Sequence, residues 1–292
     1  MKTNRYFIAS ILLLSAILIS CNTTEETDKP PNILFISIDD LRTTLGVYED
    51  TIVVTPSIDQ LATEGITFRE AFCQSAVCAP SRASLMTGVR PDSTRVWHLG
   101  DKFRKINPSA VTMPQYFSQF GYHTVNLGKI FHNYMPDSIS WDEPDLRPAR
   151  YLKKDWLKRD GETFYISAEV NASQAVKRDS LLKLRPIRYA DGWNTGPAWE
   201  AADVHDTMYY DGAQTKLAKQ TLTRLAKSNQ PFFMGLGFFR PHLPFAVPKK
   251  YWDLYDHESI PLPNNPNIPA TPPPKIIEQQ KIQQQKPQKI KK

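Results

Sequence analysis

One cysteine of this chain lies where its neighbours would change its chemistry. Residues 78–82 read Cys-Ala-Pro-Ser-Arg, and a helix-compatible stretch from Ala83 to Thr87 follows directly. Cys78 is therefore predicted at the start of a helix, where backbone N–H groups and the positive end of the helix dipole favour anions. A cysteine in that position is a candidate nucleophile.

Two adjacent carboxylates, Asp39 and Asp40, follow the apolar run 32–38. The run is rich in β-branched residues and begins after Pro31, which indicates a buried strand of a parallel sheet. Clustered carboxylate oxygens at the end of a strand are what a hard divalent cation requires. The same pair would also suit a helix cap or a solvated acidic turn.

Basic and imidazole side chains follow two further predicted strands. Lys129 and His132 come just after the strand 122–127, and could offer one cation and one acid or base to a common point. His242 follows the strand 231–239 between two prolines that would hold it rigidly, and could protonate a leaving group. By themselves these residues would equally suit a charged surface loop and a structural histidine.

The elements that would position these side chains alternate between strands and helices. This alternation predicts an α/β fold with a parallel sheet, whose ligand sites gather at the carboxyl ends of the strands. The predicted helices, besides the one that follows Cys78, span residues 56–64, 114–120 and 210–227. Residues 134–205 show no sustained periodicity beyond one helix at 173–184, and we expect this excursion to shape substrate choice.

The positive charge of the chain is concentrated at its ends. The net charge is +6, but Lys2 and Arg5 add two positive charges and residues 275–292 add five, so the remainder carries −1. The composition therefore gives no argument for a nucleic-acid partner, and we expect none. Residues 275–292 consist mainly of Lys, Gln and Ile, which predicts a disordered, low-complexity tail.

The N-terminus is similar to a bacterial lipoprotein signal. A positively charged start precedes the apolar run 6–19, which is too short for a convincing membrane span, and residues 18–21 resemble a lipobox. We expect residues 1–20 to be a signal peptide and lipid on Cys21 to hold the exported protein on a membrane surface through a tether, residues 21–31. The alternative is an ordinary cleaved signal.

The three cysteines cannot form a disulfide framework. If Cys21 carries lipid and Cys78 is the reactive group, only Cys73 remains. A lone cysteine in an apolar stretch is usually a small buried hydrophobe, and we expect this of Cys73.

Five motifs, taken together and in order, resemble the type I sulfatases. They read Asn-Ile-Leu-x-x-x-x-Asp-Asp, Thr-Pro-Ser-Ile-Asp-Gln-Leu-Ala, Cys-Ala-Pro-Ser-Arg-Ala-Ser-Leu-Met-Thr-Gly, Gly-Lys-x-x-His and Arg-Pro-His-x-Pro-Phe. Within that family the chain is most similar to the iduronate-2-sulfatase-like branch. The resemblance implies an alkaline-phosphatase/sulfatase-like fold with a mixed, mostly parallel sheet flanked by helices. Residues 32–274 would be the N-terminal part of the catalytic domain, which is incomplete at its C-terminus.

The resemblance also implies a role for each candidate residue. Cys78 would be oxidised after translation to formylglycine by a maturing enzyme that reads Pro80 and Arg82. One Ca²⁺ would be bound by Asp39, Asp40 and the oxygen of the modified Cys78. The other catalytic roles would fall to Arg82, which holds the formylglycine, Lys129, which contacts sulfate, His132, which deprotonates the diol, and His242, which lies near the leaving oxygen.

The implied reaction is the hydrolysis of sulfate esters of sulfated glycans. An unmodified Cys or Ser would leave a covalent sulfo-enzyme that is hard to discharge. A hydrated aldehyde carries two hydroxyl groups on one carbon, so that one attacks sulfur and the other later expels sulfate. The modified cysteine therefore combines a nucleophile with a release step.

Two parts of the family pattern have no match in the printed sequence: a second metal motif, Asp followed by His or Asn and Gly, and a further lysine that contacts sulfate. Asp256-His257-Glu258 imitates the motif but follows His242 too closely. We expect an under-coordinated metal and an exposed sheet edge. The chain expressed as written is therefore predicted to be unstable and poorly active.

Two other functions stay open. A phosphatase or phosphodiesterase of the same superfamily would use Ser or Thr as its nucleophile, and the Cys78 motif argues against it. A non-catalytic surface lipoprotein would bind anionic sugars through Arg82, Lys129, His132 and His242. Formylglycine at position 78 would favour an enzyme, whereas a free thiol would favour the binding protein.

Overall fold

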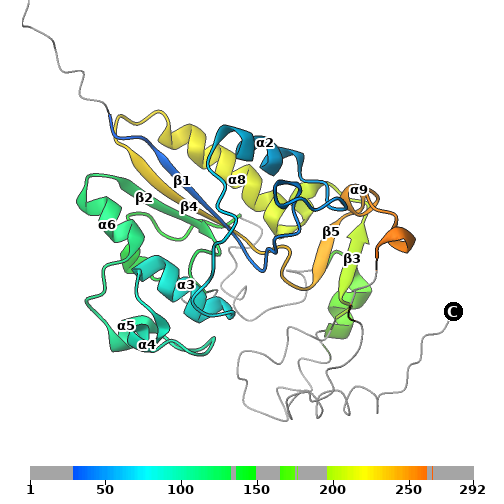
Figure 1. The fold of residues 1–292 in the computed structure, drawn as a ribbon, viewed down its shortest axis with the longest axis horizontal. Coiled ribbons are helices and arrows are strands. Elements are labelled where there is room, and N and C mark those ends of the chain that lie inside the picture. The colour runs from blue at the N-terminus through cyan, green and yellow to red at the C-terminus, as the bar shows by residue number, and fades with distance from the viewer. Residues whose placement is uncertain are drawn as a thin grey trace, which may run out of the picture.

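The computed structural model describes residues 29–132, 136–148, 165–174, 176, 196–261 and 265. Its main sheet has three strands in the order β1 (Ile33–Ile38), β4 (Phe232–Phe238) and β2 (His123–Gly128), all parallel (Figure 1). Ile38 pairs with Phe238 and Gly128 with Gly237, so the carboxyl ends of all three strands meet at one edge. The α/β prediction is confirmed, and the three predicted strands lie within one or two residues of their expected bounds.

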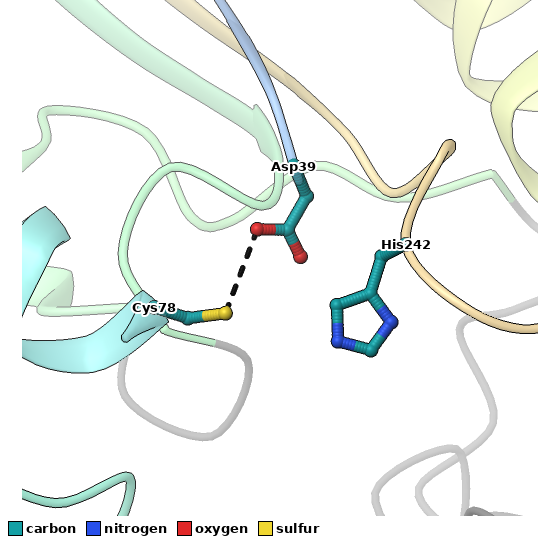
Figure 2. A group of neighbouring side chains, drawn as sticks. All are labelled: Asp39, Cys78 and His242. Carbon is teal, nitrogen blue, oxygen red and sulfur yellow. Dashed lines mark hydrogen bonds between the residues drawn. The ribbon is translucent and has the colours of Figure 1, made fainter. Parts of the chain in front are cut away.

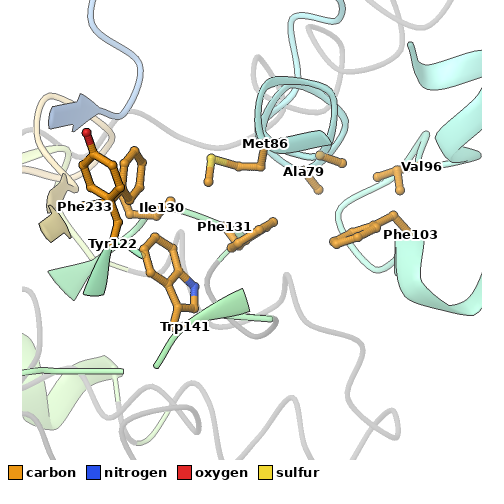
Figure 3. Packing of buried hydrophobic residues seen from close by; sticks show 10 residues of the cluster. Ala79, Met86, Val96, Phe103, Tyr122, Ile130, Phe131, Trp141 and Phe233 are labelled. Atoms are coloured by element: carbon orange, nitrogen blue, oxygen red, sulfur yellow. The ribbon is translucent and has the colours of Figure 1, made fainter. Parts of the chain in front are cut away.

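One face of the main sheet is covered by α3 (Cys78–Thr87) and α6 (Met113–Gln119). Figure 3 shows part of this core, to which Phe233 of β4, Ile130, and Met86 and Ala79 of α3 all belong. Gly88, at φ +68°, ends α3 in the left-handed conformation that glycine tolerates best. A capping box between Thr112 and Gln115 starts α6.

The opposite face of the sheet packs on α8 (Tyr210–Leu225). Val125 and Leu127 of β2 and Met234 of β4 meet Ala218 and Leu225 of the helix in a second apolar cluster. The three layers follow from strands that are apolar on both faces, as a sheet between helices requires. On this same face of the sheet, Leu34 and Ile36 of β1 remain 42% and 46% exposed.

A second, smaller sheet that the sequence did not predict pairs β3 (Trp199–Ala202) with β5 (Phe245–Pro248) in parallel. Residues 168–174 are helical, so the helix predicted at 173–184 begins earlier; residues 177–184 lie outside the described part. The remaining helices are α2 (Pro56–Glu64), α4 (Pro91–Thr94), α5 (Phe103–Ile106) and α9 (Lys249–Trp252), with 3-10 turns η1 (Gly46–Tyr48), η2 (Ser138–Ser140), η6 (Asp206–Met208) and η7 (His257–Ser259).

The predicted signal peptide (1–20) and tail (275–292) lie outside the described residues, as does most of the predicted tether (21–31). Among the residues that are described, none of the helices is both long and apolar enough to cross a membrane. The predicted lipid anchor on Cys21 therefore stays a prediction.

Candidate active site

The two predicted carboxylates take different positions at the end of β1. Asp39 is buried, and its backbone N–H donates to the carbonyl oxygen of Phe238 at 3.1 Å. Asp40 adopts a φ of +55°, which aspartate tolerates better than most residues, and its side chain is 55% exposed. The acidic pair is thus divided into one buried carboxylate and one that reaches the surface.

Arg82 reaches the buried carboxylate from the second turn of α3. Its guanidinium donates to Asp39 Oδ1 at 3.1 Å, to the carbonyl oxygens of Lys129 and Ile130 at 2.5 and 2.9 Å, and to Ser37 Oγ at 3.1 Å. The fork geometry of a guanidinium satisfies several acceptors at once. Arg82 is therefore held as a fixed positive charge at the edge of the sheet.

Lys129 brings a second cation to the same carboxylate. Its ammonium donates to Asp39 Oδ2 and lies 5.6 Å from the ring centroid of Phe239. A close backbone approach makes this possible, because a Cβ on Gly237 would collide with the backbone of Lys129. The glycines at the ends of β4 and β2 therefore let the chain after β2 cross the end of β4.

These two cations set the protonation of Asp39. Burial alone would raise the pKa of its carboxyl group, but the charges and hydrogen bonds of Lys129 and Arg82 outweigh burial and lower the pKa below its ordinary value. Asp39 is therefore a carboxylate under ordinary conditions.

Cys78 is the first residue of α3, and its Sγ donates to Asp39 Oδ1 over 3.7 Å. The helix start is where the sequence placed it. The pKa of the thiol nonetheless lies above its ordinary value, because burial, together with the negative charges of Asp39 and Asp40, outweighs the lowering by Lys129 and Arg82. The helix terminus therefore does not make this side chain a thiolate.

His242 approaches from the segment after β4. Its Nε2 lies 3.9 Å from Asp40 Oδ2, and its Nδ1 lies 2.7 Å from the carbonyl oxygen of Leu243. The start of this segment is anchored by Asp211 of α8, whose carboxylate accepts hydrogen bonds from the backbone N–H groups of Phe239 and Arg240. Asp211 thus holds the backbone at the start of the segment that carries His242.

Figure 2 shows Cys78, Asp39 and His242 pointing toward a common point, with one donor atom of each within 4.8 Å of the others. A carboxylate, a sulfur and an imidazole can together hold a divalent cation. Of the predicted ligands Asp39, Asp40 and Cys78, two belong to this group, and Asp40 adjoins it through His242. The chemistry of these donors therefore fits a cation site.

His132 occupies a different environment. It lines a cavity of about 430 Å³ together with Phe103 and Phe131, and Ala79, the neighbour of Cys78, forms part of the same wall. The cavity is mostly apolar. The role predicted for His132 as a base stays a prediction.

Several contributors were not predicted from the sequence. Asp211, in the first turn of α8, and Ser37, in β1, both support the site. Of the two, only Asp211 stands out in the sequence, as an acidic residue at a helix start, and the helix dipole explains an acid there equally well. Cys73 is exposed, so the expectation of a buried hydrophobe was wrong. Asp256 accepts a hydrogen bond from the N–H of Glu258 at the start of η7, which is a capping role.

Comparison with known proteins gives consistent matches. The family model described as Sulfatase matches residues 31–287. Iduronate 2-sulfatase of Mus musculus is 35% identical over 83% of this chain and 41% of its own length, and that of Homo sapiens is 33% identical over 94% and 47%. A sulfatase of Formosa agariphila is 35% identical over 90% and 49%. The chain therefore spans less than half the length of these relatives.

Solved structures agree at the level of the fold. Phosphonate monoester hydrolase of Agrobacterium radiobacter has a TM-score of 0.53 and 22% identity, over 80% of this chain and 45% of that chain. The phosphonate monoester hydrolase of Silicibacter pomeroyi has a TM-score of 0.51 and 22% identity, over 82% and 47%. At these identities the likeness concerns architecture alone.

Proposed function

Because the chain belongs to the sulfatase family, we propose that it hydrolyses sulfate esters of sugars, using a formylglycine formed from Cys78 together with a divalent cation. The observation that carries the proposal is the position of Cys78 at the start of α3, 3.7 Å from a carboxylate that two buried cations hold. Arg82 and Lys129 would offer positive charge to an anionic ester that reaches this point.

Asp39, Asp40 and an oxygen at position 78 would hold the cation, and their hard donors favour Ca²⁺. When bound, the ion would polarise the sulfate and lower the pKa of a nearby hydroxyl group. One departure from this assignment is visible, because both oxygens of Asp39 already accept from Arg82 and Lys129. Lys129 would therefore have to exchange its carboxylate for a sulfate oxygen when substrate enters.

The remaining residues would act on charge and protons. Arg82, held by two carbonyl oxygens, would keep residue 78 in place, while the ammonium of Lys129 would bind sulfate. Nδ1 of His242 faces a carbonyl oxygen and carries a proton, so Nε2 could exchange one with the leaving oxygen. His132 would serve as the base toward residue 78.

We propose sulfated sugars as the substrate class, since two relatives that are 33–35% identical to this chain are named as iduronate 2-sulfatases. An exported protein held on a membrane by lipid on Cys21 would meet such polymers outside the cytoplasm. A formylglycine-generating enzyme would be its partner during maturation.

Mass spectrometry of the Cys78 peptide, after co-expression with a maturing enzyme, tests this proposal. We expect formylglycine, and Pro80→Ala and Arg82→Lys should reduce its yield, whereas Cys73→Ser should not. Sulfate release from a sulfated disaccharide is then measured. We expect turnover that requires Cys78, and release that persists in Cys78→Ala would contradict the proposed nucleophile.

The same assays separate the alternatives. A free thiol with retained sugar binding would identify a non-catalytic lipoprotein. Turnover of a phosphate diester or phosphonate ester that exceeds turnover of the sulfate ester would identify a hydrolase of the other class.

A further inference from the structure

An apolar cavity of about 430 Å³ lies beside α3. Its lining includes Ala79 and Ala83 of α3, Val96, Phe103 of α5, and Phe131, several of which are labelled in Figure 3. Ligand pockets in proteins occupy about 300–1,000 Å³ and are lined mostly by apolar side chains. The cavity therefore has the size and the chemistry of a site for a small molecule.

The cavity is distinct from the charged site at the end of the main sheet. Asp39, Arg82 and Lys129 are not among the described residues that line it. The two places are nevertheless close along the chain, because Ala79 follows Cys78 and because His132 contributes to the lining. An occupant of the cavity would therefore lie beside the predicted nucleophile without meeting its cations.

Two small side chains on one face of α3 create the hollow. Ala79 and Ala83 are four residues apart, so they lie one above the other on the same side of the helix. Both are buried, with 3% and 4% of their surface exposed, but neither side chain extends beyond its Cβ. A leucine at residue 83 would project into the space that these alanines leave.

The aromatic walls of the cavity are held by their neighbours. Phe103 and Phe131 stack with their ring centroids 5.9 Å apart and their planes at 13°. The guanidinium of Arg104 lies 4.8 Å from the centroid of Phe103, and Trp141 meets Phe131 edge to face at 6.5 Å. A ligand would therefore find preformed walls, and binding would not have to order these rings.

The charged groups of the lining favour an uncharged ligand. Arg104 is paired with Asp137 at 2.8 Å, and the carboxylate of Asp101 accepts two backbone N–H groups. Lys102 is exposed, so that solvent and salt screen its charge. A charged ligand would lose its hydration without gaining a buried counter-charge, and a sugar would leave most of its hydroxyl groups without partners.

The cavity has a mouth at the surface. Pro108, Ser138 and Ile139 belong to its lining and are exposed, whereas Val96 is 1% exposed. A small molecule can therefore reach the buried part of the cavity without local unfolding of α3.

We propose that this cavity binds one uncharged aromatic molecule of one or two rings. A flat ring can make offset or edge-to-face contacts with Phe103 and Phe131 in addition to burying apolar surface. An apolar cavity of about 150 Å³ is large enough for benzene, so the larger cavity here has room for a second ring. The site goes beyond the proposed function, since it needs neither formylglycine nor a sulfate ester.

Fluorine NMR of 5-fluoroindole added to the full chain tests the proposal, because the protein itself gives no fluorine signal. We expect binding that saturates at one equivalent and that unlabelled indole reverses. Indole-3-carboxylate has the same two rings and a negative charge, and it should bind more weakly by roughly tenfold or more.

Single variants test whether the cavity is the site. Ala83→Leu fills it from α3 and should weaken 5-fluoroindole binding by roughly tenfold or more, and Val96→Leu, a smaller change at another wall, should weaken it less. Phe72→Ser is the matched control: it removes a ring that is 85% exposed and outside the lining, and it should leave binding unchanged. Circular dichroism shows whether each variant folds.

Histidine side-chain resonances in ¹H–¹⁵N spectra locate the ligand. The imidazole of His132 should shift when indole binds, whereas that of His205, which is outside the lining, should not. The variant His132→Gln identifies the His132 signal.

The proposal is overturned if 5-fluoroindole does not bind, if the folded filling variants bind it as the parent does, or if Phe72→Ser abolishes binding. Equal affinity for indole-3-carboxylate would contradict the uncharged class of ligand, and an unshifted His132 would contradict the location. None of these outcomes alters the formylglycine assay, which judges the proposed function by itself.

Discussion

Two Arg–Asp pairs among the described residues, both largely shielded from solvent, have nearly the same chemistry and different surroundings. Arg82 pairs with Asp39 at 3.1 Å at the carboxyl end of the main sheet, and Arg104 pairs with Asp137 at 2.8 Å beside α6. The side chains of the first pair are 7% and 4% exposed, and those of the second 18% and 7%. Burial and pairing therefore do not distinguish them.

The partners of each pair do distinguish them. Arg104 also donates to the carbonyl oxygens of Pro108 and Ala110 and to Gln115 Oε1, so it ties the chain around α6 together. Asp39 instead holds a second cation, Lys129, and adjoins the thiol of Cys78. A buried ion pair alone is weak evidence of function, whereas one shared with a nucleophile and a second cation indicates an active site.

Removing the acid of each pair should have the largest effect. Asp39→Asn leaves two buried cations without a counter-charge, and we expect the free energy of unfolding to fall by about 3–5 kcal/mol. Asp137→Asn leaves one cation that keeps four other acceptors, the last of them Ser140 Oγ, and the loss should be about 2 kcal/mol. Urea denaturation measures both. Equal losses would mean that Lys129 does not depend on Asp39.

The loss of stability at acid pH should depend on the protonation of the same carboxylate, Asp39. The pKa of Asp39 lies below its ordinary value of 3.8 in the folded chain, so the unfolded chain takes up the proton at the higher pH. The stabilisation of the folded chain by the Asp39 carboxylate is complete above the ordinary pKa, and it is lost as pH falls through the pKa of Asp39 in the folded chain. Asp39→Asn should therefore flatten the fall in stability below about pH 4. An unchanged slope, measured by urea midpoints across pH, would contradict this.

Removing Lys129, the second cation, should change the pKa of the Cys78 thiol rather than the fold. The charge of Lys129 lowers the pKa of Cys78, so Lys129→Met should raise that pKa further. Alkylation of Cys78 near pH 9 should slow by up to about tenfold, the effect of one pKa unit. Peptide mass spectrometry follows Cys78 and, as an internal control, Cys73. Arg104→Met should leave the Cys78 rate unchanged, and equal slowing in both variants would indicate a general loss of structure.

The smallest expected difference in stability comes from the serine hydroxyl groups that accept from each arginine, Ser37 from Arg82 and Ser140 from Arg104. Ser37→Ala removes one acceptor from Arg82, which retains two carbonyl oxygens, and should lower the free energy of unfolding by about 0.5–1 kcal/mol. Ser140 is fully buried and also contacts Thr112 Oγ1 at 2.6 Å, so Ser140→Ala should lose about 1–2 kcal/mol. The reverse order would show that the first arginine depends on Ser37 more than its geometry indicates.

Local patterns were sufficient to predict much of the architecture. The strands β1, β2 and β4 are short apolar runs bounded by proline, glycine or acidic residues, and their positions follow from periodicity. The sheet of β3 and β5 was missed, since residues 199–202 and 245–248 are short and, in the part of the chain that the structure describes, each is paired only by the other. A pairing across more than forty residues leaves no local signal.

The candidate site shows the same division. The sequence by itself determined that Cys78 starts a helix, that acidic and basic groups follow the strands, and that these motifs are those of the sulfatases. The tertiary structure alone decided that Asp39 is buried while Asp40 reaches the surface, and that Asp211 anchors the segment of His242. Neighbouring residues share a motif, but burial and charge pairing depend on elements that only folding brings together.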